Sequence, residues 1–113
     1  MRIGIMGAHY GHIRGMFHSA TNAKNGEIVG FVEADNTIYN SYKTDHNIPR
    51  YSTLEEMLEK SRPELVLEGV THQEKVDVIE KCAAAGVHVL LDKPLCRSFE
   101  DWMRIKIAVD TYK

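Results

Sequence analysis

The feature that most constrains the fold is an abrupt change of hydrophobic pattern near the start of the chain. Apolar residues dominate positions 3–6, and this short run stops at Gly7. Beyond it, apolar residues recur at the i, i+3, i+4 and i+7 positions of one helix face, namely Ile13, Met16, Phe17 and Ala20. The sequence therefore predicts a buried strand, a tight glycine turn and a helix, in that order.

This order is typical of the opening unit of a dinucleotide-binding fold. A helix N-terminus leaves backbone N–H groups unpaired and carries partial positive charge, so a pyrophosphate can bind there. The candidate binding loop comprises Gly7, Ala8, His9, Tyr10, Gly11, His12 and Ile13.

The glycine spacing of this loop departs from the usual G-x-G-x-x-G pattern. Counted from Gly7, His9 and His12 stand at the second and third glycine positions, while Gly11 and Gly15 fall elsewhere. The imidazole N–H groups can donate to phosphate oxygens. A plain strand–turn–helix without a ligand remains an alternative on this loop alone. We expect no metal site, because no third ligand stands at a suitable spacing from the two histidines.

A second candidate binding element is the acidic end of the strand predicted over residues 27–33. Glu33 and Asp35 stand at its tip, where a carboxylate can accept hydrogen bonds from the adenosine ribose hydroxyls. Such a carboxylate would also repel a 2′-phosphate, which favours NAD, with NADP as the alternative cofactor. We take Glu33 as the ribose ligand and Asp35 as its substitute; otherwise Glu33 is a solvated loop carboxylate.

Strands and helices alternate along the rest of the chain. Extended segments are predicted over 48–51, 65–70 and 87–91, and helices over 36–47, 54–60, 74–85 and from residue 98 onward. Capping boxes of the S/T-x-x-E type are predicted at residues 52–55 and 71–74, and Ser98 with Asp101 forms a similar helix start. The stripe predicted to be buried on the last helix is Trp102, Ile105, Val109 and Tyr112.

This alternation predicts an α/β fold, a Rossmann-like doubly wound parallel sheet in three layers, as one domain over residues 1–113. Ligands of such sheets bind at the carboxyl ends of the strands. The residues expected to converge there are Gly7, Glu33, Val70, Thr71, His72, Asp92, Lys93 and Pro94.

Composition narrows the function classes. The net charge of −2 gives no reason to expect nucleic-acid binding. No apolar run approaches the length of about 18 residues needed to span a membrane, and no secretory leader is evident. Cys82 and Cys96 match no zinc spacing, and two unpaired thiols suit a reducing compartment, so we expect a cytoplasmic protein.

The segment Gly86-Val-His-Val-Leu-Leu-Asp-Lys-Pro-Leu95 resembles the "AGKHVLCEKPLA" segment of the Gfo/Idh/MocA oxidoreductases. Residues 2–7, 52–58 and 74–85 fit the same family. The resemblance implies an NAD(P)-dependent dehydrogenase of sugars, inositols or related polyols, with Lys93 as the catalytic residue beside the nicotinamide. An ammonium there can polarise a carbonyl or stabilise an alkoxide during hydride transfer.

Residues 70–75 align with the family's "TPNHLH" segment, but His72 replaces the asparagine and Lys75 the closing histidine, and Asp92 replaces the usual glutamate of Glu-Lys-Pro. The family also carries a second α+β domain that these 113 residues do not include. We expect hydride transfer to require that domain, and an uncovered sheet edge to favour homo-oligomers. The alternatives are a non-catalytic nucleotide sensor, or a domain in which His9 and Tyr10 fill the site and no nucleotide binds.

Overall fold

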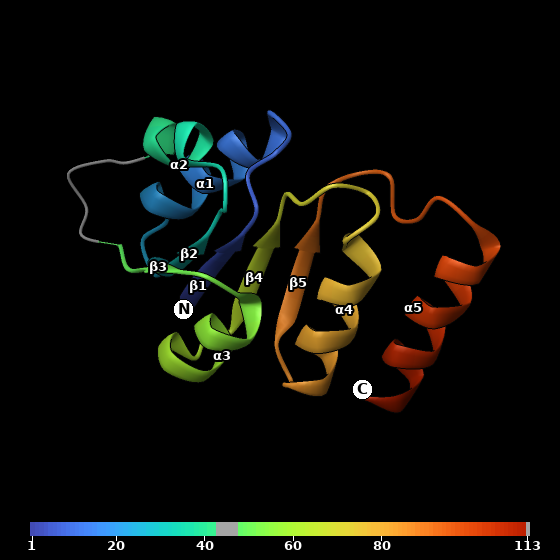
Figure 1. Cartoon of the computed structure of the whole chain (residues 1–113). Coiled ribbons are helices and arrows are strands. Elements are labelled where there is room, and N and C mark those ends of the chain that lie inside the picture. The colour runs from blue at the N-terminus through green and yellow to red at the C-terminus, as the bar shows by residue number, and fades with distance from the viewer. Residues whose placement is uncertain (43–47, 113) are drawn as a thin grey trace.

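The computed structural model describes residues 1–42 and 48–112, which form a parallel sheet flanked by helices (Figure 1). Its strands, in the order β3-β2-β1-β4-β5, are β1 (Arg2–Met6), β2 (Glu27–Val32), β3 (Arg50–Tyr51), β4 (Leu65–Glu68) and β5 (His88–Leu91). The helices are α1 (His12–Asn22), α2 (Asn36–Tyr42), α3 (Leu54–Ser61), α4 (Lys75–Ala84) and α5 (Phe99–Thr111). The prediction of a doubly wound α/β fold is confirmed, because this order follows the usual 3-2-1-4-5 arrangement.

The alternation of side chains along the strands divides the core between the two faces of the sheet. Ile3 and Ile5 of β1 pack with Phe17 of α1 and Tyr42 of α2 on one face. On the other face, a second cluster joins β4 to α3 and α4, with Met57 at its centre. Figure 1 shows the same division, with α1 and α2 on one side of the sheet and α3 and α4 on the other.

Two paired glycines let α3 approach the sheet. Gly4 of β1 lies opposite Gly30 of β2, and both face the fully buried Met57 side chain. A Cβ at Gly4 would come within 2.8 Å of Met57 Cε, and one at Gly30 within 2.9 Å of Met57 Cγ. The Met57 thioether therefore occupies the space that a side chain at position 4 or 30 would need.

The predicted helix start at Ser98 is confirmed, because its hydroxyl accepts from the Asp101 N–H at 3.1 Å. Helix α3 begins at Leu54 as predicted, but its N-cap lies one residue later than predicted. Thr53, rather than Ser52, is the N-cap, and its hydroxyl accepts from the Glu56 N–H at 3.1 Å. Both residues could cap, and the extended backbone at Thr53 decides between them.

The Thr71–Glu74 pair does not cap α4 as predicted. The Thr71 hydroxyl donates to the Glu74 carboxylate at 2.8 Å, and the Glu74 N–H donates to the Thr71 carbonyl at 3.0 Å. The pair therefore closes a turn, and the helix begins after it at Lys75. The physical reason is that the Glu74 N–H donates to the Thr71 carbonyl and not to the Thr71 hydroxyl.

The predicted buried stripe of α5 is wrong for three of its four residues. Ile105 is buried, but Trp102, Val109 and Tyr112 are 42%, 56% and 50% exposed, and Ala108 is buried in their place. The reason is that α5 packs along α4 rather than on the sheet (Figure 1).

The predicted helix over 36–47 is described as α2 up to Tyr42, and residues 43–47 lie outside the described part of the chain. None of the described helices has the length and apolar character needed to cross a membrane.

Candidate cofactor site at the carboxyl ends of β1, β4 and β5

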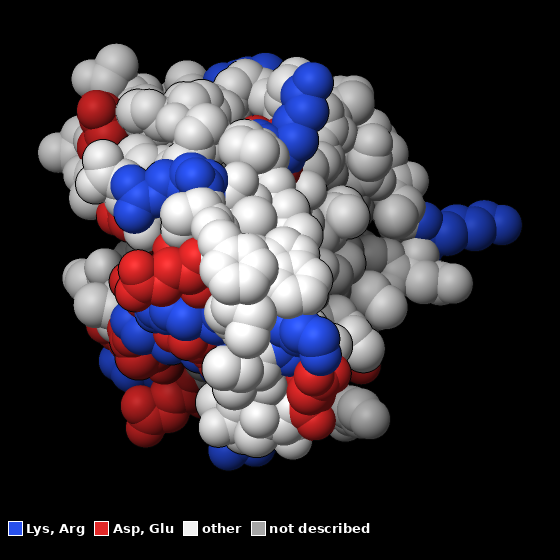
Figure 2. Space-filling view, turned by 90° about the vertical axis from the view of Figure 1, so that its right-hand side faces the viewer, with Lys and Arg blue, Asp and Glu red and all other residues white. Residues whose placement is uncertain are grey.

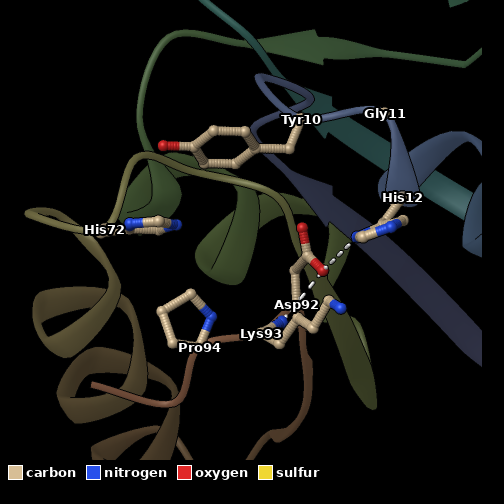
Figure 3. Close-up of a pocket in the computed structure, with 7 residues that line it drawn as sticks. All are labelled: Tyr10, Gly11, His12, His72, Asp92, Lys93 and Pro94. Carbon is tan, nitrogen blue, oxygen red and sulfur yellow. Dashed lines mark hydrogen bonds and ion pairs between the residues drawn. The ribbon is translucent and has the colours of Figure 1, made fainter. Parts of the chain in front are cut away.

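The loops after β1, β4 and β5 meet at one edge of the sheet and line an open cavity of about 460 Å³ (Figure 3). From β1 the chain continues to β2 on one side of the sheet, and from β4 it continues to β5 on the other side. Open α/β sheets bind ligands at the carboxyl ends of the two strands where the connections diverge in this way. The cavity is lined by Tyr10, Gly11, His12, His72, Asp92, Lys93 and Pro94. Four residues of the predicted convergence line the cavity, namely His72, Asp92, Lys93 and Pro94. The other four, Gly7, Glu33, Val70 and Thr71, also follow strand ends but are not part of its lining.

Two glycines allow the β1 and β4 loops to touch. Gly7 has φ +76°, and a Cβ there would lie 2.6 Å from Val70 Cγ1. A Cβ at Gly69 would lie 2.6 Å from the Gly7 carbonyl oxygen and 2.9 Å from Ile13 Cβ. Gly69 therefore provides the close approach of helix to strand that the third fingerprint glycine usually provides. Gly69 was not predicted from the sequence, although a glycine beside Val70 at a strand end was the available signal.

The aromatic residues of the loops form one wall of the site. Tyr10 stacks on His72 with ring centroids 5.0 Å apart, and His9 meets Tyr10 edge-on at 4.5 Å. His9 is exposed and does not line the cavity, and its backbone N–H donates to the Gly69 carbonyl at 2.8 Å. His9 and Tyr10 therefore leave the cavity open.

The predicted ribose ligand Glu33 lies at the tip of β2, beside the cavity rather than in its lining. Its Oε1 accepts from the Ala8 N–H at 2.8 Å, and its Oε2 accepts from the Asp35 N–H at 2.9 Å. Asp35 Oδ1 accepts from the Ile38 N–H at 3.1 Å and so caps α2. Each Glu33 oxygen retains a further acceptor position, because a carboxylate oxygen can accept more than one hydrogen bond.

The turn after β5 carries Lys93 at the cavity. Asp92 is almost fully buried, and its Oδ1 accepts from the Lys93 N–H at 2.9 Å. The same oxygen lies 3.1 Å from His12 Nδ1, as the dashed line in Figure 3 shows. His12 thus links the loop after β1 to the turn that bears Lys93.

A buried ion pair that was not predicted from the sequence lies beneath this turn. Lys75 Nζ is 3.2 Å from Glu68 Oε1, and these side chains are 3% and 0% exposed. Burial raises the pKa of Glu68, while Lys75 and two backbone N–H groups act in the opposite direction. The available signal was an acidic residue within the apolar strand of residues 65–70.

A family model described as "Oxidoreductase family, NAD-binding Rossmann fold" matches residues 1–113. No curated protein matches this chain.

Three similar solved structures come from Lactobacillus plantarum, Chromobacterium violaceum and Synechocystis sp. PCC 6803. The first is myo-inositol 2-dehydrogenase, with 15% identity and a TM-score of 0.85 over 99% of this chain and 33% of that chain. The second is the WlbA dehydrogenase in complex with NADH and UDP-GlcNAcA, with 18% identity and a TM-score of 0.85 over 99% and 32%. The third is biliverdin reductase in complex with biliverdin and NADP+, with 18% identity and a TM-score of 0.84 over 98% and 35%. At these identities the likeness shows the fold alone, and this chain spans about a third of the length of each.

Proposed function

This chain belongs to the Gfo/Idh/MocA oxidoreductase family with an NAD-binding Rossmann fold, and we propose that it binds NAD as the cofactor domain of a dehydrogenase. The proposed reaction transfers a hydride between the nicotinamide and a sugar, an inositol or a related polyol. The observation that carries the proposal is the position of Lys93, which lines a cavity at the carboxyl ends of the strands.

The loop after β1 fits a dinucleotide. A Cβ on Gly11 would meet nothing within 4 Å, so the N-terminus of α1 is open to a ligand. Among the described residues, no acceptor pairs with the backbone N–H groups of Tyr10 and Gly11. These two groups and the positive end of α1 would hold the pyrophosphate. Glu33, at the tip of β2, would accept from the adenosine ribose with its remaining lone pairs.

Lys93 would act at the reacting end of the site. Its backbone N–H is held by Asp92, and across the described part of the chain its ammonium joins no hydrogen bond or ion pair. When bound, the cofactor supplies the nicotinamide ring that accepts or donates the hydride. The Lys93 ammonium would polarise the substrate carbonyl, or stabilise the alkoxide formed by removing the hydroxyl proton.

The substrate class rests on the family resemblance and on the dehydrogenase of myo-inositol among the similar structures. The cavity walls formed by Tyr10, His72 and Pro94 suit the flat nicotinamide ring of the cofactor, and His12 and Lys93 line the same cavity. This chain spans about a third of the length of the similar structures. We therefore propose that most substrate contacts come from a further domain.

Calorimetric titration of the full chain with NADH and NADPH tests the cofactor assignment. We expect NADH to bind more tightly than NADPH, because the Glu33 carboxylate repels a 2′-phosphate. Glu33→Gln keeps a carbonyl acceptor but removes the charge. It should therefore lower the ratio of NADH affinity to NADPH affinity by about tenfold, as expected for a hydrogen bond to a charged group.

Asp35→Asn is the matched control, since it removes a neighbouring charge from a side chain that caps α2. Equal narrowing by both variants would indicate a general electrostatic effect and not a ribose contact. If neither NADH nor NADPH binds, the proposal is overturned.

A further inference from the structure

We infer that the buried Glu68–Lys75 pair positions the Lys93 turn for the cofactor, an inference that rests on the proposed function. The Lys75 ammonium has three donors, and the structure supplies three acceptors. They are Glu68 Oε1 at 3.2 Å, the Pro94 carbonyl at 2.7 Å and the Asp92 carbonyl. The two carbonyls belong to the residues on either side of Lys93, so Lys75 binds the turn on both sides of that residue.

Glu68 holds the same turn from the end of β4. Its Oε1 accepts from the Asp92 N–H at 3.1 Å, and its Oε2 accepts from the Val70 N–H at 3.0 Å. The Asp92 backbone is therefore fixed through its N–H by Glu68 and through its carbonyl by Lys75. Both partners stand on regular elements, since Glu68 ends β4 and Lys75 begins α4.

Lys75 acts through Lys93 and not on a ligand directly. It is almost fully buried, and its ammonium donates to the two carbonyls and pairs with Glu68. Replacing a buried ion pair by well-packed apolar residues of similar volume often leaves stability unchanged. Such residues could not bind the two carbonyls, however, so the pair has a geometric effect that is separable from its contribution to stability.

The test compares NADH with ADP-ribose, which has the adenosine and pyrophosphate but lacks the nicotinamide. Both are titrated into the full chain carrying Lys75→Met, and into the double variant Glu68→Gln with Lys75→Met, which leaves no buried charge unpaired. Lys81→Met is the control, because Lys81 lies on the same helix but is half exposed and pairs with Glu55.

We expect both Lys75 variants to weaken NADH binding by about tenfold relative to ADP-ribose, the size of effect typical of hydrogen bonds to a charged group. The control should not change this ratio. A parallel loss of both ligands, or no loss in the folded double variant, would show that the pair only stabilises the fold and would overturn the inference.

Hydrogen exchange of the ligand-free protein separates this inference from the proposed function. If the original chain binds neither ligand, the proposed function fails, but the positioning role is still decided by the amides of Asp92 and Lys93. Their exchange should accelerate about tenfold in the double variant, while the Ile5 amide in β1 remains unchanged. Unchanged exchange at Asp92 and Lys93 would overturn the inference.

Discussion

Single residues at the site carry out tasks that their types alone do not specify. Glu33 could have been a solvated carboxylate, but its two oxygens connect the Ala8 and Asp35 amides. His12 stands at a glycine position of the usual fingerprint, and its ring contacts Asp92 rather than only facing a phosphate. Each residue therefore links two loops that the chain order separates.

The charge on Lys93 gives a prediction at this scale. The nicotinamide ring is positive in NAD+ and neutral in NADH, so a nearby ammonium disfavours the oxidised form. We expect Lys93→Met to raise the affinity for NAD+ relative to NADH by about fivefold, from the Coulomb energy of about 1 kcal/mol between two unit charges about 4 Å apart in water. Calorimetric titration with both forms measures this ratio.

Lys106→Met is the control. Lys106 is exposed on α5 and pairs with Asp110 of the same helix, and neither residue lines the cavity. An unchanged ratio in Lys93→Met would place the ammonium away from the nicotinamide and would remove its proposed catalytic role.

At the scale of elements, hydrophobic periodicity identified the strands and helices, but hydrogen-bonding patterns set their ends. Ser98 caps α5 as predicted, whereas Thr53 replaces Ser52 at α3 and Thr71 closes a turn before α4. Adjacent Ser and Thr residues offer the same hydroxyl to a helix end. The backbone path arriving from the preceding strand then decides which one accepts the bond.

The packing of α3 on the sheet predicts a strong energetic coupling between Gly4 and Met57. Met57→Ala should lower the free energy of unfolding by about 2–5 kcal/mol, because Met57 is fully buried. Gly4→Ala should cost about 1–3 kcal/mol, since its Cβ would lie 2.8 Å from Met57 Cε. In the Met57→Ala background the same change should cost less, because the cavity accepts the methyl group. Urea unfolding of the four proteins measures the coupling.

Gly15→Ala serves as the glycine control, because a Cβ at this position of α1 would meet nothing within 4 Å. We expect it to stabilise the protein by about 0.5–1 kcal/mol through helix propensity. Additive costs for Gly4 and Met57 would contradict the close approach of α3 to β1.

At the scale of the whole molecule, α5 stands apart from the core. It packs along α4, and its outer side exposes Phe99, Trp102 and Ile107 to 77%, 42% and 59%. Figure 2, which views this side, shows an uncharged stripe bordered by charged side chains. Arg104 of α5 pairs with Asp77 and Glu80 of α4. Ion pairs exposed in this way add little to stability.

This arrangement predicts that α5 opens before the sheet does. Because the helix buries only Ile105 and Ala108, native-state hydrogen exchange should give its amides a lower opening free energy than those of β1 and β4. The exchange of α4 provides the internal comparison, since that helix buries five residues against its neighbours. Exchange of α5 only through global unfolding would contradict the prediction.

The sequence by itself determined the alternation of strands and helices, the glycine turn at Gly7 and the chain positions of Glu33 and Lys93. These features depend on local periodicity and on backbone conformation, which neighbouring residues control. The parallel sheet then brought the strand ends to one edge, so the convergence of the site also followed from the pattern.

Only the tertiary structure decided what lies beneath and between these loops. The contact of Gly69 with Gly7, the His12–Asp92 bond and the Glu68–Lys75 pair all join segments that are separate in the chain. The buried face of α5 was likewise fixed by α4 and not by the helix's own apolar residues. The physical reason is that a charged or apolar side chain is stabilised by the partner it meets on folding, and local sequence does not specify that partner.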